Sequence, residues 1–376
     1  MKLLLIAPST RAMAESAKKA GYNFISLDFF GDIDQKEICE NYSLNHEFKE
    51  EYTIENLFKH AQDLEFTHVV YGSGFENHPE LVEEFEKRCI VLGNDSDTLR
   101  KVRDWEYLFR ELRRRNIPFP RTEITSPDEA KEIIKSERNW LIKPIKSGGG
   151  HSIYDRQNIL EMEELGSKVL LQEYIEGKPV SSTVICAEEG CFCTGSTEQL
   201  VGTFFNKYRY AGNITPLDEG KEVIEKIEET SCQISHAFKL KGSNGIDFIL
   251  KNGEPYVLEV NPRITGSMEV LERAHGTNIL DLHVKACLKE NFDLKVKKSG
   301  KFWSKKILFA DRDIIYKERL DFIKDVPHYG ERIDKESPIC TVLGEGKTRG
   351  ECYADLLNKE RLVYESLWKD NIQRHR

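Results

Sequence analysis

Three residues near position 250 have the types and the spacing of a magnesium site. Asp247 lies in a strand-like segment that begins at Gly245, and Glu259 and Asn261 lie in a second such segment after a turn. Residues two apart on a strand point to the same face, and a hairpin would fold Asp247 back beside Glu259 and Asn261. Converging oxygen ligands of this kind suit Mg²⁺. The alternative is a half-buried hairpin whose polar face simply meets water.

The same hairpin resembles a motif of the ATP-grasp superfamily. Carboxylate-amine ligases, biotin carboxylase and carbamoyl-phosphate synthetase of that family carry an Asp on one strand and a Glu-x-Asn-x-Arg run on the next. The matching residues here are Asp247, Glu259, Asn261 and Arg263. The resemblance implies that the first three bind one or two Mg²⁺ ions, or Mn²⁺ in their place. It also implies that Arg263 is catalytic and stabilises the transferred phosphoryl group or an acyl phosphate through a bidentate contact.

A second block that matches the family lies upstream, from Trp140 to Ser152. An apolar strand would deliver Lys143 into a nucleotide cleft, where the resemblance implies contacts with the α- and β-phosphates. The strand is followed by a glycine loop, which consists of Ser147, Gly148, Gly149 and Gly150. Its backbone N–H groups could close over phosphates, because glycine permits a close approach. The alternative for a glycine triplet is a flexible linker.

The third block, from Val169 to Gly177, resembles the adenine hinge of the family, an apolar strand that runs into a short connection. The resemblance implies that backbone groups read the purine edge there, so the identity of the side chains matters little. The hinge residues are Gln172, Glu173, Tyr174 and Ile175. An ordinary core strand that ends in a glycine turn would look the same. The position of this block between the other two favours the hinge.

Two positions depart from the family pattern. Many members have a Lys before a helix, and this Lys reaches the α-phosphate. When the length of that helix is used to align this chain with the family, Trp105 occupies the position of the Lys. Lys101 or Arg103 could replace it from a neighbouring turn, or the contact is absent. A Glu that often grips the ribose hydroxyls is replaced by Pro179 or Val180. The sequence therefore assigns no ribose-binding residue.

Composition limits the class of protein and its partners. A chain of 376 residues with 39% hydrophobic content can bury two or three cores. The net charge of −9 disfavours binding to nucleic acid or to an anionic membrane. No segment reaches the roughly 18 apolar residues of a membrane span, and the first apolar run ends at Pro8, too early for a signal peptide. Nine cysteines without a Cys-x-x-Cys pair are typical of thiols in a reducing compartment. We expect a soluble cytoplasmic protein with no membrane or nucleic-acid partner, and we leave a homodimer open.

The N-terminal part has the pattern of a small parallel sheet. A strand over residues 2–8, a helix over 11–20 and a strand over 22–29 form a βαβ opening, and further strands are expected over 67–71 and 89–93. In the family, this domain chiefly forms the wall of the cleft on the substrate side. The candidate substrate contacts are Ser9, Thr10, Arg11, Ser73 and Glu76. The alternative for these residues is ordinary loop and helix-cap chemistry.

The composition changes after Leu294, where a basic run over residues 295–306 precedes short strands and a terminal helix from Glu351 to Trp368. This pattern is similar to the small β-rich C-terminal domain of biotin carboxylase and the purine-pathway carboxylases. The predicted fold is thus a mixed α/β and α+β chain. Its predicted parts are a Rossmann-like pre-ATP-grasp domain (1–100), an ATP-grasp domain of two α+β subdomains that grip ATP (101–293, lid about 122–175) and a β-rich C-terminal domain (294–376).

The resemblance implies an ATP-grasp ligase that uses ATP and Mg²⁺. It would activate a small-molecule carboxylate as an acyl phosphate, release ADP and join the acyl group to an amine or another nucleophile. The segment over residues 204–213 is predicted to bind the substrate carboxylate through Lys207, Arg209 and Tyr210. The alternative for this segment is an exposed basic turn.

Three other functions stay open at this point. A biotin- or bicarbonate-dependent carboxylase would fit the C-terminal pattern and the context of Arg263. A small-molecule kinase would leave a stable phosphorylated product. A non-catalytic nucleotide-binding subunit would fit Trp105 at the usual lysine position, but the complete set of metal-binding residues disfavours it. The sequence does not identify the carboxylate or the nucleophile.

Overall fold

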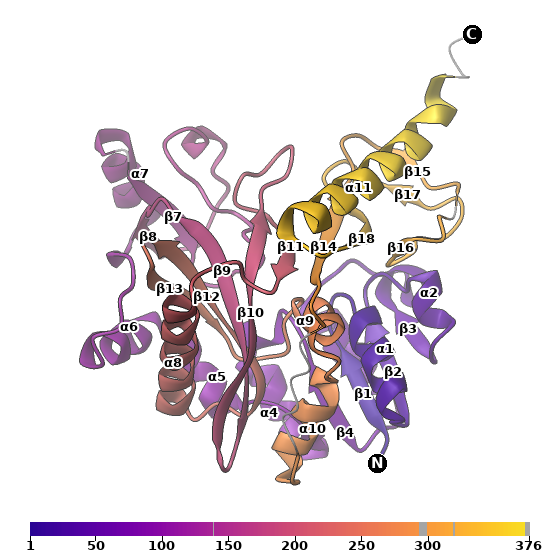
Figure 1. The fold of residues 1–376 in the computed structure, drawn as a ribbon, viewed down its shortest axis with the longest axis horizontal. Helices are drawn as coiled ribbons and strands as arrows, with labels where there is room; N and C mark the ends of the chain where they lie inside the picture. The colour runs from indigo at the N-terminus through magenta and orange to yellow at the C-terminus, as the bar shows by residue number, and fades with distance from the viewer. Residues whose placement is uncertain (138, 293–298, 319, 373–376) are drawn as a thin grey trace.

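The computed structural model describes residues 1–137, 139–292, 299–318 and 320–372, with the side chains of the last helix described up to residue 368. It combines a parallel sheet near the N terminus, a large antiparallel sheet, a three-stranded antiparallel sheet and a two-stranded antiparallel sheet of β15 (Ile314–Ile315) and β17 (Arg332–Ile333) (Figure 1). The predicted fold class, a mixture of parallel α/β and α+β parts, is confirmed.

The N-terminal sheet is entirely parallel. In spatial order its strands are β3 (Asn41–Ser43), β2 (Phe24–Asp28), β1 (Leu3–Ile6), β4 (His68–Tyr71) and β5 (Ile90–Val91). The predicted βαβ opening is confirmed, because α1 (Arg11–Ala20) connects β1 to β2. This helix ends at Gly21, whose φ of 77° is left-handed and suits glycine. The chain order reverses beside β1, and such sheets bind ligands at the carboxyl ends of the strands next to this point.

Helices cover both faces of the parallel sheet. They are α2 (Ile33–Lys36), α3 (Ile54–Ala61), α4 (Pro79–Arg88), α5 (Ser96–Arg103), α9 (Met268–His275) and α10 (Ile279–Leu288), together with α1. Leu3 and Leu5 pack with α1 and α10, whereas Leu4 and Ile6 pack with α3 and α4. Burial on both faces explains why β1 is an unbroken apolar run rather than an alternating one.

The large antiparallel sheet runs through the centre of the molecule (Figure 1). In spatial order its strands are β13 (Glu254–Asn261), β12 (Gly242–Lys251), β9 (Lys178–Ala187), β10 (Gly190–Val201), β11 (Tyr210–Thr215), β14 (Phe302–Phe309), β18 (Pro338–Gly346) and β16 (Ile323–Lys324). The pairing of β11 with β14 carries the sheet into the C-terminal segment. The strands expected to form a separate C-terminal domain therefore continue the central sheet. The predicted boundary at residues 293 and 294 lies outside the described residues, so the division into domains stays a prediction.

A third, smaller sheet forms the part at the upper left of Figure 1. It consists of β6 (Thr122–Thr125), β8 (Val169–Glu173) and β7 (Trp140–Pro144), covered by α7 (Pro127–Ser136). It has its own core, in which Ile134, Ile142 and Leu171 are buried. This part overlaps the segment predicted as a lid, and the C-terminal helix α11 (Arg349–Ile372) lies opposite it in the view.

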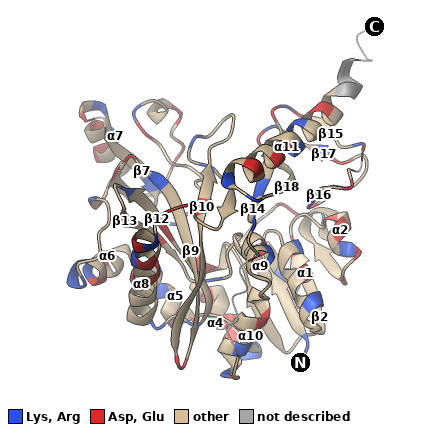
Figure 2. Cartoon of the chain, in the orientation of Figure 1, with Lys and Arg blue, Asp and Glu red and all other residues tan. Residues whose placement is uncertain are grey.

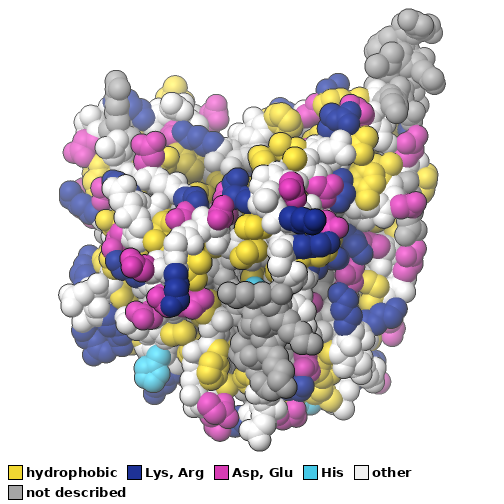
Figure 3. Space-filling model, in the orientation of Figure 1, with side chains coloured by type: hydrophobic (Ala, Val, Ile, Leu, Met, Phe, Trp, Pro, Cys, Tyr) yellow, Lys and Arg dark blue, Asp and Glu magenta, His cyan; other side chains and the backbone are white. Residues whose placement is uncertain are grey.

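Charged side chains of both signs are spread over the outer surface. Figure 2 shows Lys and Arg together with Asp and Glu on α6 (Trp105–Arg114), α8 (Lys221–Phe238) and α11. Figure 3 shows the two signs interspersed over the face that it draws. Such a surface has no extended field of one sign on this face. Among the described residues, none of the helices has the length and apolar character needed to cross a bilayer.

Candidate active site

One large cavity, with a volume of about 1010 Å³, is lined by most of the site residues that the sequence singled out. Its lining comes from the parallel, the central and the three-stranded sheets and includes Ser9 after β1, Lys143 on β7 and Asp247 on β12. The glycine loop and the four predicted hinge residues also line it. The cavity therefore brings together segments that are far apart in the sequence.

The predicted metal-binding residues lie on one hairpin, formed by β12 and β13. Asp247 is directly opposite Glu259 in the antiparallel register. The Asn261 amide donates from Nδ2 to Oδ2 of Asp247 at 2.9 Å. A tight turn at Asn252 and Gly253, with φ values of 52° and 79°, joins the strands, and Asn-Gly turns of this kind fix the register of a hairpin.

The two facing carboxylates create a site that favours a cation. Burial and the charge of Glu259 raise the pKa of Asp247 to about 7. Two carboxylates and an amide oxygen are hard donors of the kind that Mg²⁺ binds, so the residues present fit this ion. Among the described residues, no cluster of three or more His, Cys, Asp or Glu side chains could hold a metal. Further ligands would have to come from water and substrate phosphates, as is usual for Mg²⁺.

We expect Mg²⁺ binding to strengthen as the pH rises. A protonated carboxyl group does not bind the ion, so Asp247 must lose its proton when the metal binds. Because the pKa of Asp247 is about 7, the apparent affinity for Mg²⁺ should be about tenfold higher at pH 8 than at pH 6. Calorimetric titration with Mg²⁺ in the presence of ADP measures this dependence. The Asp247→Asn variant should lack this pH dependence. If the affinity of the native protein for Mg²⁺ did not change with pH, the assignment of Asp247 as a ligand would be contradicted.

Arg103 reaches both the metal hairpin and the glycine loop. Its Nη1 donates to Oε1 of Glu259 at 2.7 Å, and its Nη2 donates to the carbonyl oxygen of Ser147 at 3.0 Å. Trp105, at the usual lysine position, is buried and donates from Nε1 to the carbonyl oxygen of Ile145. Lys101 is exposed. Of the two replacements that the sequence left open, the structure brings only Arg103 to the site.

Lys143 lies on β7 and is held by a residue of the predicted hinge. Its Nζ donates to Oε1 of Gln172 at 2.6 Å. Burial lowers the pKa of Lys143, although the charges of Glu259 and Asp247 oppose that effect. A poorly hydrated ammonium group is well suited to contact phosphate oxygens. The expectation that backbone groups of the hinge read the purine edge stays a prediction, and the Gln172 side chain has a separate contact, with this lysine.

Two backbone N–H groups of the predicted hinge already have hydrogen-bond partners within the protein. The N–H of Glu173 donates to the carbonyl oxygen of Arg121, and the N–H of Tyr174 donates to that of Asn139, both at 2.8 Å. In the part of the chain that the structure describes, the N–H of Ile175 has no backbone acceptor. Among the N–H groups of residues 173–175, that of Ile175 is therefore the one left to meet a base.

The glycine loop is closed at its base. Ile142 and Tyr154 exchange two backbone hydrogen bonds, at 2.8 and 2.9 Å, so the loop projects as a hairpin. Gly150 has a φ of 75°, and a Cβ atom there would lie 1.9 Å from the carbonyl oxygen of Tyr208. Only glycine fits this close approach. The loop is thus packed against the segment that was predicted to bind a carboxylate.

The basic segment before β11 lines the cavity with Lys207, Arg209 and Tyr210. Lys207 forms an ion pair with Asp155, which neutralises its charge. Arg209 donates to Nδ1 of His151 at 3.0 Å, and among the described residues it forms no ion pair with a carboxylate. Burial and the charge of Arg209 lower the pKa of His151 to about 4, so the imidazole is neutral at pH 7. Arg209 is accordingly the better placed cation for an anionic substrate group.

Arg263 is mostly buried, with 10% of its side chain exposed, and is held from two sides. Its Nε donates to Oε1 of Glu76 at 2.7 Å, and its Nη2 donates to Oδ1 of Asn261 at 3.2 Å. Glu76 was expected to contact substrate, but it is absent from the cavity lining and positions Arg263 instead. Thr10 is likewise absent from the lining and donates its hydroxyl to Asp28. Ser9, Arg11 and Ser73 do line the cavity.

Four charged lining residues were missed by the sequence analysis: Asp32, Asp155, Lys305 and Asp325. Asp32 lies in the loop after β2, where the carboxyl end of a parallel strand was a usable signal. Lys305 and Asp325 come from the C-terminal strands, and no local pattern connects them with the N-terminal sheet.

The family model described as the ATP-grasp domain matches residues 102–267, a span that contains Lys143, the glycine loop, the hinge and the metal hairpin. The chain contains an ATP-grasp domain. An uncharacterized protein of Methanocaldococcus jannaschii is 28% identical to this chain over 361 residues, which are 92% of this chain and 88% of that protein. The carbamoyl phosphate synthase large chain of Thermoanaerobacter pseudethanolicus is 27% identical over 232 residues. That match covers 57% of this chain but only 21% of the synthase.

Solved structures share the fold over nearly the whole chain. The biotin carboxylase of Campylobacter jejuni in complex with β,γ-ATP has a TM-score of 0.71 and 15% identity, and covers 93% of this chain and 89% of that one. Phosphoribosylamine–glycine ligase of Thermotoga maritima has a TM-score of 0.71 and 16% identity, with 95% and 96% covered. These likenesses extend the shared fold beyond the ATP-grasp domain to the N-terminal sheet and the C-terminal strands.

Proposed function

We propose that this ATP-grasp protein is a ligase that activates a small-molecule carboxylate as an acyl phosphate and joins it to an amine or another nucleophile. The observation that carries the proposal is the convergence of Lys143, the glycine loop and the Asp247–Glu259 pair on one cavity inside the ATP-grasp domain. Mg²⁺ or Mn²⁺ held by Asp247, Glu259 and Asn261 would neutralise the charge of the phosphoryl group during its transfer.

The remaining roles follow from the charges and the positions of the side chains. Lys143, oriented by Gln172, would hold phosphate oxygens of ATP. The glycine loop would exclude water from the phosphates, since stray water would hydrolyse an acyl phosphate. Arg263, whose position is set by Glu76, would stabilise the developing charge on the acceptor carboxylate. Arg209 would bind the substrate carboxylate before the reaction.

A ligase that forms C–N bonds is supported by the likeness to phosphoribosylamine–glycine ligase. A carboxylase is the second candidate, because the biotin carboxylase likeness covers 93% of this chain, C-terminal strands included. The two candidates differ in the acceptor of the phosphoryl group, and ATP hydrolysis that bicarbonate alone stimulates would favour the carboxylase.

The products should be ADP and inorganic phosphate. A phosphate-release screen with pooled carboxylates and amines would find the substrates, and ¹⁸O in the substrate carboxylate should then appear in the phosphate. The label moves because the carboxylate oxygen attacks the γ-phosphorus, and the acyl C–O bond breaks when the nucleophile attacks carbon. AMP and pyrophosphate, or unlabelled phosphate, would contradict the acyl phosphate route. A stable phosphorylated product without phosphate release would indicate a kinase.

A further inference from the structure

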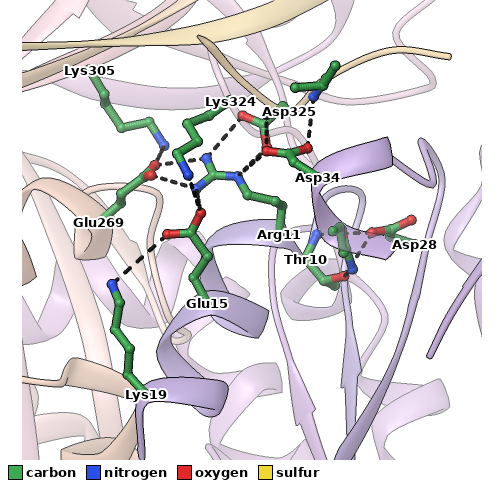
Figure 4. Close-up of polar contacts among 12 residues, drawn as sticks. Thr10, Arg11, Glu15, Lys19, Asp28, Asp34, Glu269, Lys305, Lys324 and Asp325 are labelled. Carbon is green, nitrogen blue, oxygen red and sulfur yellow. Dashed lines mark hydrogen bonds and ion pairs between the residues drawn. The ribbon is translucent and has the colours of Figure 1, made fainter. Parts of the chain in front are cut away.

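A cluster of buried charged residues lies where the N-terminal sheet meets the C-terminal strands (Figure 4). At its centre is Arg11, the first residue of α1. Its Nη1 and Nη2 donate to the two carboxylate oxygens of Glu269 at 2.5 and 3.0 Å, and its Nε and Nη2 donate to those of Asp325 at 2.9 and 3.2 Å. Arg11 and Asp325 both line the cavity of the proposed active site.

The cations of this cluster are already paired. Arg11 is shared by Glu269 and Asp325, Lys305 donates to Glu269 at 3.3 Å, and Lys324 donates to Glu15 at 2.7 Å. Six carboxylates lie around these three cations and Lys19, which forms an ion pair with Glu15; they are Glu15, Asp28, Asp32, Asp34, Glu269 and Asp325. The cluster therefore has an excess of negative charge next to a cavity that small molecules can enter.

Asp32 is the carboxylate left without a partner. Only 5% of its surface is exposed, yet it lines the cavity. Its Oδ2 atom is buried without a hydrogen bond, and among the described residues its side chain enters no ion pair. Asp32 stands just before α2, where an aspartate normally accepts a hydrogen bond from a backbone N–H of the first turn. No such bond is present, so the Asp32 carboxylate does not cap the helix.

The surroundings of Asp32 make this arrangement costly. Burial and the charges of Asp325, Asp28 and Asp34 raise the pKa of Asp32. A buried charge without a partner destabilises a fold, and a cation that entered the cavity would relieve the repulsion. The side chains that could have neutralised Asp32 from within the protein bind other carboxylates instead.

We propose that this end of the cavity binds a positively charged amino or guanidino group of a substrate, with the carboxylate of Asp32 as its main partner and Asp325 beside it. The inference rests on the proposed function, in which the group belongs to the amine substrate. A protonated nitrogen has no lone pair and cannot attack an acyl phosphate, so the substrate carries a second nitrogen. That neutral nitrogen forms the new C–N bond, phosphate leaves with the electron pair of the broken C–O bond, and the nitrogen loses a proton.

Calorimetry on the full-length protein with MgADP tests the proposal without requiring turnover. The probes are putrescine, cadaverine and agmatine, and butanediol is the neutral analogue. We expect at least one of the three cations to bind, Asp32→Asn to weaken its affinity at least tenfold, and butanediol not to bind. Asp97→Asn removes one negative charge from an exposed side chain of α5 and should bind the cation as the native protein does. Absence of binding by all three cations, or unchanged affinity in Asp32→Asn, would overturn the proposal.

Thermal unfolding separates a binding role of Asp32 from a structural one. Removing an unpaired buried charge should leave the unfolding midpoint of Asp32→Asn equal to or above that of the native protein. Asp32→Ser provides the same comparison with a different side chain, and lower midpoints in both variants would indicate a structural role and overturn the proposal. Binding of the cations in a protein that does not turn over ATP would refute the proposed ligase reaction but support this site. Turnover with amines that carry no second cationic group would support the proposed ligase reaction but refute this site.

Discussion

Replacement of Glu259 by Gln is expected to abolish Mg²⁺-dependent ATP turnover, and so is replacement of Asn261 by Ala. Glu259 faces Asp247 across the hairpin, and Asn261 donates a hydrogen bond to it. Losing one ligand should remove about 4 kcal/mol of transition-state stabilisation, which corresponds to about a thousandfold lower rate. Phosphate release measured with saturating substrates would detect that loss.

A neighbouring residue on the same strand provides the matched control. Glu254 is also on β13, but it forms an ion pair with Lys226 and does not line the cavity. Glu254→Gln should therefore keep the native rate, and all three variants should unfold cooperatively like the native protein. Native turnover in a chain that carries both Glu259→Gln and Asn261→Ala would contradict the metal assignment.

Replacement of Lys143 by Ala should weaken ATP binding far more than replacement of Lys146 by Ala. Lys143 is on β7, lines the cavity and has a poorly hydrated ammonium group held by Gln172. Its charge-assisted contacts with phosphate should contribute about 1.5–3 kcal/mol, or about ten- to hundredfold in affinity. Lys146 lies beyond the end of the strand and is exposed. Calorimetry with ATP compares the two variants.

Because the two lysines are three positions apart, each variant controls for the loss of one positive charge near the glycine loop. Equal losses of affinity would mean that Lys143 does not contact the phosphates. The pairing of β7 with β8 would then orient the wrong side chain toward the nucleotide, and the assignment of the hinge would fail with it.

Much of the candidate site could be predicted because its geometry is local. The alternation of a strand and an Asn-Gly turn set the register that puts Asp247 opposite Glu259. The same reasoning predicted the βαβ opening, whose helix and strands follow from hydrophobic periodicity alone. In both cases the residues that meet are joined by a short stretch of chain, so few other arrangements compete.

Side-chain contacts across the hairpins and loops were harder to predict. The sequence left open whether Lys101 or Arg103 reaches the nucleotide side, and it gave the Gln172 side chain no role. Arg103, and not Lys101, contacts Glu259 and Ser147, because the end of α5 lies beside both. That position depends on how α5 packs on the rest of the molecule, which no pattern within α5 specifies.

The ATP-grasp blocks and the types of residue in them could be recognised from the sequence, since each depends on a short segment with a fixed backbone period. The folded structure was needed to show that β14 joins the central sheet, and that Arg11 meets Glu269 and Asp325. These contacts join residues from about 90 to more than 300 positions apart, and their free energy competes with that of many alternative pairings across the whole chain. The sequence could not show that the Asp32 carboxylate lacks a partner. That conclusion depends on which carboxylates the neighbouring cations bind, and those ion pairs also join distant parts of the chain.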